Sequence, residues 1–187
     1  LEFAPSTIGA FDVSTIQGSE SVGAYIFWEK GIFRKEKYRL FKIKTVEGMN
    51  DYGMLREIIV RAFQDPLSEI PDLIIIDGGK SQLSIAKRVF DILNIQCEVI
   101  AIAKKPDRAF LLNEEMVSLE DKSNTSALLK NIRDEAHRFA ITYHRKLRDK
   151  RNFQSPLENI KGVGKIRRLE LLKHFGSIEN IKRANAE

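Results

Sequence analysis

The spacing of apolar residues along the chain changes near residue 50. Before that point, residues 7–13 and 22–28 are nearly continuous apolar runs, and residues 32–44 alternate apolar and polar positions. Runs of this length with turn residues between them are typical of β-strands. The first part of the chain therefore predicts three strands that pair as an antiparallel meander.

After residue 50 the pattern alternates helices with short buried strands. Helical spacing predicts one helix that Asn50 or Asp51 can cap, a second helix after residue 79, and a long third helix over residues 123–148. Residues 73–77 and 99–103 are short apolar runs, which indicate strands buried on both faces of a parallel sheet. Residues 104–122 predict a loop-rich stretch with a short hairpin around Phe110 to Leu112.

The order of these elements limits the topology. Strands that are joined through helices run parallel, by right-handed crossover. The sequence therefore predicts an α/β protein with a ribonuclease H-like fold, in which helices flank a mixed five-stranded sheet over residues 1–150. Residues 148–156 are charged and end in proline, so they predict a linker, and residues 151–187 predict a small all-helical appendage.

Composition excludes several classes of protein. The longest uninterrupted apolar runs have five residues, whereas a membrane helix needs ~20. Cys97 is the single cysteine, so an internal disulfide and a cysteine-based zinc site are excluded. We expect a cytoplasmic protein without a membrane partner. The chain lacks an initiating Met, which indicates a fragment excised from a longer protein.

Basic residues gather in the last third of the chain. Residues 1–132 hold 17 Lys and Arg against 19 Asp and Glu, whereas residues 133–187 hold 14 against 7. The net charges are −2 and +7, which sum to the +5 of the whole chain. A basic segment on a near-neutral body favours a polyanion such as nucleic acid as partner. A solvated basic surface is the alternative.

Two aspartates stand at strand ends that the predicted topology brings together. Asp12 ends the first strand and Asp77 ends the strand over residues 73–77. Carboxylates at neighbouring carboxyl ends of parallel strands can hold a divalent metal through hard oxygen ligands. The alternative for each is an aspartate that caps a turn. His137, on the long helix, could ligate metal or act as a base if that helix covers the same edge, and is otherwise a packed or surface histidine.

Residues 159–176 carry a pattern typical of a helix-hairpin-helix. Gly162 and Gly164 would let the backbone approach a DNA phosphate, and the basic residues of the helix that follows would add positive charge. Those basic residues are Lys165, Arg167 and Arg168. An ordinary helical hairpin with a glycine turn is the alternative.

Three motifs together resemble a known family. Residues 11–18 (FDVSTIQG), 77–83 (DGGKSQL) and 133–144 (RDEAHRFAITYH) are similar to the C-terminal half of UvrC, the incision subunit of bacterial nucleotide excision repair. The resemblance covers nearly the whole chain, and the third motif is long and specific. Basic residues within the motifs, Lys80, Arg133 and Arg138, are candidate DNA contacts.

The resemblance implies a function and a set of site residues. The family's C-terminal half is a ribonuclease H-like nuclease followed by a tandem helix-hairpin-helix, here truncated at Glu187. It implies a divalent metal, Mg²⁺ or Mn²⁺, and incision of the damaged strand on the 5′ side of the damage. Asp12, Asp77 and His137 take the catalytic positions, with Asp12 and Asp77 on the metal, and Asp51 supports them.

The resemblance also implies partners. These are damaged double-stranded DNA and, in the full-length protein, UvrB, which binds a segment absent from this chain. A non-catalytic scaffold that holds DNA for a partner nuclease is the alternative function.

Overall fold

The structure is a computed structural model of residues 1–187. The chain divides into two compact units, residues 1–143 and residues 144–187. The residues that the structure describes are 4–14, 21–44, 50–65, 67–153, 157, 160 and 162–184.

Eight strands form one mixed sheet in the described part of the first unit. Strand β1 pairs parallel with β5, and β5 pairs parallel with β6, while every other pairing is antiparallel. The order across the sheet is β3-β2-β1-β5-β6-β7-β8, with β4 also on β2. The strands are β1 (Thr7–Ser14), β2 (Val22–Glu29), β3 (Ile32–Phe33), β4 (Arg39–Lys42), β5 (Leu73–Asp77), β6 (Glu98–Ala103), β7 (Arg108–Phe110) and β8 (Met116–Ser118).

This arrangement confirms the predicted meander and parallel crossovers, but the predicted count of five strands is wrong. The segment expected as one strand over residues 32–44 is interrupted by the short 3₁₀ helix η1 (Lys35–Lys37). Its two parts, β3 and β4, pair separately with β2. The hairpin expected around Phe110 to Leu112 is present as β7 and β8, and it adds two more strands to the sheet. Alternation of apolar residues does not show where a twisted strand breaks.

The described residues also form five α-helices, none of which is long and apolar enough to cross a membrane. Asn50 caps the first helix, because its side-chain oxygen accepts a hydrogen bond from the Gly53 amide at 3.0 Å. The third helix runs to Phe153, past the predicted end at residue 148, since no glycine or proline stops it there. The helices are α1 (Asp51–Phe63), α2 (Lys80–Ile92), α3 (Asn124–Phe153), α4 (Lys165–Phe175) and α5 (Ile178–Arg183).

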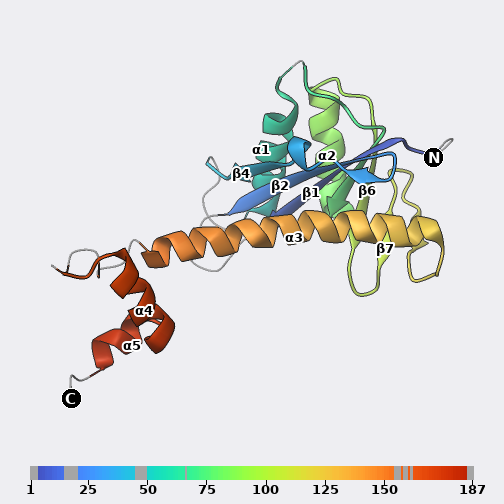
Figure 1. The fold of residues 1–187 in the computed structure, drawn as a ribbon. Coiled ribbons are helices and arrows are strands. Elements are labelled where there is room, and N and C mark those ends of the chain that lie inside the picture. Colours follow the sequence, from blue (N-terminus) through green and yellow to red (C-terminus); the bar gives the residue numbers. More distant parts are fainter. Residues whose placement is uncertain are drawn as a thin grey trace. The chain divides into compact units, whose positions relative to one another are not determined.

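Helices α1 and α2 cover one face of the sheet and α3 covers the other (Figure 1). On one face, Phe11, Ile74 and Ile76 join a core with apolar residues of α1 and α2. On the other face, Ile8, Ala10, Leu73, Ile75, Ile100 and Ile102 join Ile132 and Ala136 of α3. Because side chains alternate along a strand, even positions of β1 and β6, and odd positions of β5, face α3.

Gly23 lets α1 approach β2 closely. A Cβ atom at Gly23 would lie 2.4 Å from Cγ2 of Ile58, a fully buried residue of α1. We expect Gly23→Ala to lower the free energy of unfolding by about 1–3 kcal/mol through overpacking. Urea unfolding measures this change. In an Ile58→Ala background, which removes the clashing atoms, the same substitution should cost clearly less, and an equal cost in both backgrounds would contradict the prediction.

Candidate active site

Strand alternation and parallel pairing bring two carboxylates together. Asp12 lies two residues after Ala10 on β1, and Asp77 lies two residues after Ile75 on β5. Ala10 and Ile75 belong to the core beneath α3, and side chains two apart on a strand share a face, so both aspartates face α3. The parallel register pairs Phe11 with Ile76, the residues that directly precede the two aspartates. Asp12 and Asp77 therefore lie next to each other at the carboxyl end of the sheet.

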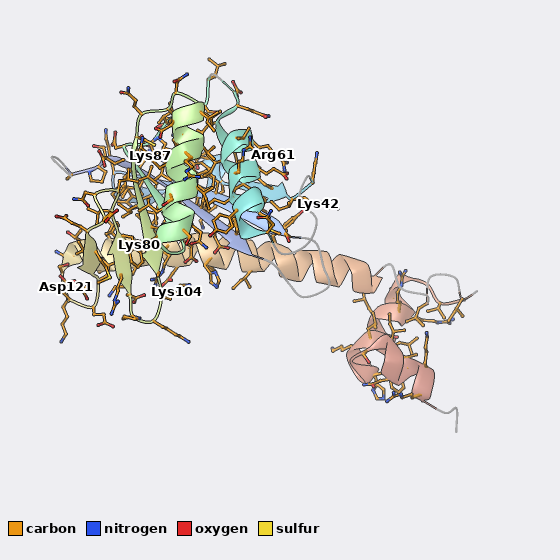
Figure 2. The ribbon with its side chains drawn as sticks, turned by 180° about the vertical axis from the view of Figure 1, so that it is seen from behind. Lys42, Arg61, Lys80, Lys87, Lys104 and Asp121 are labelled. Atoms are coloured by element: carbon orange, nitrogen blue, oxygen red, sulfur yellow. The ribbon has the colours of Figure 1, made fainter. Side chains whose placement is uncertain are left out.

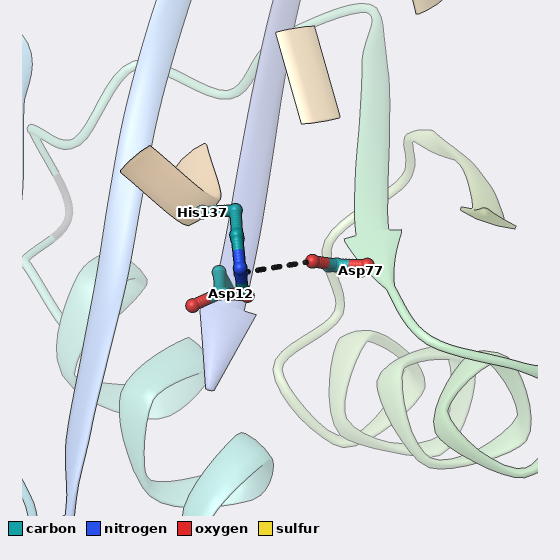
Figure 3. A group of neighbouring side chains, drawn as sticks. All are labelled: Asp12, Asp77 and His137. Carbon is teal, nitrogen blue, oxygen red and sulfur yellow. Dashed lines mark hydrogen bonds and ion pairs between the residues drawn. The ribbon is translucent and has the colours of Figure 1, made fainter. Parts of the chain in front are cut away.

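Helix α3 brings His137 to the same edge. Ile132, Ala136 and Ala140 of α3 are fully buried, and their mostly small side chains let the helix lie close to the sheet. The Nδ1 atom of His137 is 3.1 Å from Oδ1 of Asp12 and 3.6 Å from Oδ2 of Asp77 (Figure 3). The histidine side chain is 41% exposed, whereas that of Asp12 is 4% exposed. The cluster therefore combines a buried carboxylate, that of Asp12, with an imidazole that is partly exposed to solvent.

Two carboxylates that lie close together dominate the electrostatics of this cluster. Burial, together with the hydrogen bond and negative charge of Asp12, raises the pKa of Asp77 to about 7, while Lys104 and His137 act in the opposite direction. Two carboxylates placed this close resist ionising together. A divalent cation would relieve that repulsion. Asp12, Asp77 and His137 each offer one ligand atom, and these atoms lie within 4.8 Å of one another.

The donor set fits a divalent metal that prefers oxygen ligands. Carboxylate oxygens are the ligands of hard divalent cations, and an imidazole nitrogen can complete such a site for a divalent metal that also accepts nitrogen. Asp51 is the first residue of α1, and its side chain lies outside the described residues, as do residues 15–18 of the first motif.

The three basic residues of the motifs have different surroundings. Lys80 is exposed at the first position of α2. Arg138 is exposed and makes two 2.6 Å hydrogen bonds to the carboxylate of Glu135, one turn earlier on α3. Arg133 is 4% exposed and pairs with Asp107 and Asp134, so its guanidinium is held inside the fold rather than presented to solvent.

The predicted hairpin residues lie in the second unit. Gly162 has φ +94°, a conformation that favours glycine, and its carbonyl accepts a 2.8 Å hydrogen bond from Arg167. Gly164 is the residue before α4, and Arg167 is exposed on that helix, whereas Arg168 is 9% exposed. The side chain of Lys165 lies outside the described residues.

Sequence reasoning missed one charged residue of this edge. Lys104 follows β6, and its Nζ atom is 3.9 Å from Oδ2 of Asp77 and 3.6 Å from Oδ1 of Asp134. The signal was available, because Lys104 continues the alternation of Ile100 and Ile102 at the end of a predicted parallel strand. A lysine in a loop is common on any surface, so this position alone does not identify a site residue.

The sheet topology and this acidic edge define a ribonuclease H-like α/β protein. The chain belongs to the UvrC RNase H endonuclease domain family, whose model matches residues 1–141. Curated relatives named UvrABC system protein C match nearly the whole chain. The protein of Clostridium tetani is 46% identical over 98% of this chain, and that of Clostridium acetobutylicum is 43% identical over all of it. The chain spans about a third of the length of these relatives, 33% in both cases.

Solved structures of endonuclease V overlap part of the chain. Human endonuclease V has a TM-score of 0.40 and 13% identity, over 54% of this chain and 46% of that protein. Endonuclease V of Bacillus subtilis has a TM-score of 0.35 and 19% identity, over 54% of this chain and 45% of that protein.

The raised pKa of Asp77 predicts how stability depends on pH. The folded protein keeps this proton up to about pH 7, while the unfolded chain releases it near the ordinary value of 3.8. Without metal, the free energy of unfolding should therefore fall as pH rises from about 5 to about 8. Asp77→Asn removes the titrating group, so the variant should lose less stability over this range, by on the order of 1–4 kcal/mol.

Urea unfolding at about pH 5 and at about pH 8, in a buffer that contains a metal chelator, measures this difference. Asp91→Asn is a matched control, because Asp91 is 56% exposed on α2 and pairs with Lys87, which is not part of the cluster. The control should follow the wild type. The same pH dependence in wild type and Asp77→Asn would contradict the raised pKa.

Proposed function

We propose that the chain is the metal-dependent endonuclease unit of a bacterial nucleotide excision repair protein, which cuts the damaged strand on the 5′ side of the damage. The observation that carries the proposal is the meeting of Asp12, Asp77 and His137 at the carboxyl end of β1 and β5. Ligands bind at this edge in open α/β sheets. Membership of an endonuclease domain family supports the same reaction class.

Asp12 and Asp77 would hold the metal, Mg²⁺ or Mn²⁺. Asp12 is the anchor, since its side chain is the least exposed of the three and faces both partners. A bound divalent ion supplies positive charge beside the phosphate that is attacked. His137 stays outside the primary ligands, because its Nδ1 atom faces the Asp12 carboxylate at 3.1 Å. Asp51 would support these residues, a role that rests on the family resemblance.

His137 would act as the base in hydrolysis. Its Nδ1 atom faces Asp12 at 3.1 Å, so an Nδ1–H donor there leaves Nε2 as the basic nitrogen. A water oxygen forms a bond to phosphorus, and one of its protons passes to Nε2. The ester bond to the leaving oxygen then breaks, and that oxygen takes a proton from solvent. The products are two strand ends, one with a phosphate and one with a hydroxyl.

Substitutions at Asp12 and His137 separate metal binding from chemistry. Asp12→Ala should abolish Mn²⁺-dependent nicking of supercoiled plasmid and also Mn²⁺ binding by calorimetry. His137→Ala should lower nicking by about 10²–10⁴-fold, the usual contribution of a base, yet keep most of the Mn²⁺ affinity. Because the cluster carries only two described carboxylates, the DNA-free protein should hold at most one ion tightly.

His174→Ala is the matched control, since His174 is an exposed histidine of α4. It should cut and bind metal like the wild type. Equal nicking by wild type and Asp12→Ala would instead favour a scaffold that holds DNA for another nuclease. Two tight sites of equal affinity, or loss of Mn²⁺ binding in His137→Ala, would contradict the assigned roles.

We propose that the second unit binds the DNA backbone as a helix-hairpin-helix. The turn at Gly162, the start of α4 after Gly164 and the basic residues of α4 support this role. Such contacts read phosphates and not bases. Exposed Lys80 and Arg138 are further candidate contacts. As part of a longer protein, the chain would work in the cytoplasm with UvrB on damaged duplex DNA.

Removal of residues 157–187 should weaken DNA binding and flatten its salt dependence. Each lost phosphate contact should reduce the slope of log affinity against log salt by about 0.9. The sheet should keep its melting temperature, because both core clusters lie before residue 144. Fluorescence anisotropy with a labelled duplex at several salt concentrations measures the slope. An unchanged slope would remove the hairpin from the interface.

A further inference from the structure

Lys104 lies in the candidate active site, in the same row as the two aspartates. Strands β1, β5 and β6 are neighbours and parallel, so Asp12, Asp77 and Lys104 stand at one edge of the sheet. Ile100 and Ile102 belong to the core beneath α3, and Lys104 is the next residue of that alternation. Figure 2 shows Lys104 at the same end of the first unit as Lys80, the start of α2.

The ammonium of Lys104 lies between carboxylates of two different elements. Its Nζ atom is 3.9 Å from Asp77 of β5 and 3.6 Å from Asp134 of α3. Both distances are longer than a hydrogen bond, so these carboxylates draw the ammonium toward the site by charge alone. The side chain is 36% exposed, which leaves it accessible to a ligand. A lysine has three N–H donors and no acceptor.

The segment that carries Lys104 is fixed to α3. Arg133, 4% exposed, pairs with Asp107 of the same loop and with Asp134, which is 2.9 Å from the guanidinium. Opposite charges therefore alternate from Asp77 through Lys104, Asp134 and Arg133 to Asp107. Arg133 lies one turn before His137 on α3, so one buried arginine joins the helix of the histidine to the loop of the lysine.

We propose that Lys104 is a further catalytic residue, which donates hydrogen bonds to a non-bridging oxygen of the phosphodiester that is cut. This inference rests on the proposed nuclease function. A phosphate oxygen fits the positive charge and the N–H donors of Lys104. The two carboxylates can bind a cation, and the neighbouring lysine can bind the anionic phosphate. Lys104 stabilises the negative charge that grows on the phosphate oxygens.

Lys104→Gln tests the proposal, with Lys105→Gln as the matched control. Lys105 is the adjacent exposed lysine, and glutamine retains a long polar side chain at its positive φ of 57°. Nicking of supercoiled plasmid at saturating Mn²⁺ should fall by about 10²–10³-fold in Lys104→Gln, as for other lost donors at a developing negative charge. Lys105→Gln should stay within about twofold of the wild type, the scale of a surface substitution.

Two measurements without DNA separate this role from others. In Lys104→Gln, calorimetry should show Mn²⁺ binding that is unchanged or tighter. The substitution removes an ammonium that would repel a cation at Asp77. The melting temperature should also match that of Lys105→Gln. Loss of Mn²⁺ affinity, a large drop in melting temperature, or equal nicking by the two variants would each overturn the proposal. A wild type that never nicks with Mn²⁺ would overturn the nuclease function itself, and this inference with it.

Discussion

Asp12 and Asp77 meet because β1 and β5 run parallel in a register that sets Phe11 beside Ile76. Every later feature of the site depends on this pairing. A shift of one residue in either strand would turn its carboxylate toward the core beneath α1 and α2. The apolar residues that precede the aspartates oppose such a shift, because it would move whole rows of buried side chains to the wrong face. Hydrophobic burial thus holds two like charges together.

The cost of this arrangement is visible in the electrostatics of the cluster. Burial and the proximity of Asp12 raise the pKa of Asp77 to about 7, so the metal-free site favours a shared proton over two charges. The fold supplies partial compensation from one side through Lys104 and from the other through His137. Two carboxylates held this close together, one of them with a raised pKa, favour a cation as ligand.

Helix α3 connects the core to the chemistry. Ile132 and Ala136 are buried against the sheet, whereas His137 and Asp134 project from the edge of that buried stripe toward the site. Arg133 fixes the helix to the loop after β6 from within the fold. Its place in the third sequence motif made it a candidate DNA contact, yet its 4% exposure shows a guanidinium engaged by two aspartates of the protein. Sequence alone does not distinguish these roles, because both require a positive charge.

The sequence by itself determined the order of the main elements, the parallel crossovers and the two strand ends where Asp12 and Asp77 stand. These follow from local apolar periodicity and from the chirality of connections, which short segments of chain already express. Only the tertiary structure decided the break between β3 and β4, the direction in which each aspartate points, and the contacts of Lys104 with Asp77 and Asp134. Those features depend on twist, on the pairing register and on the distance between atoms from strands far apart in sequence, and no local pattern encodes them.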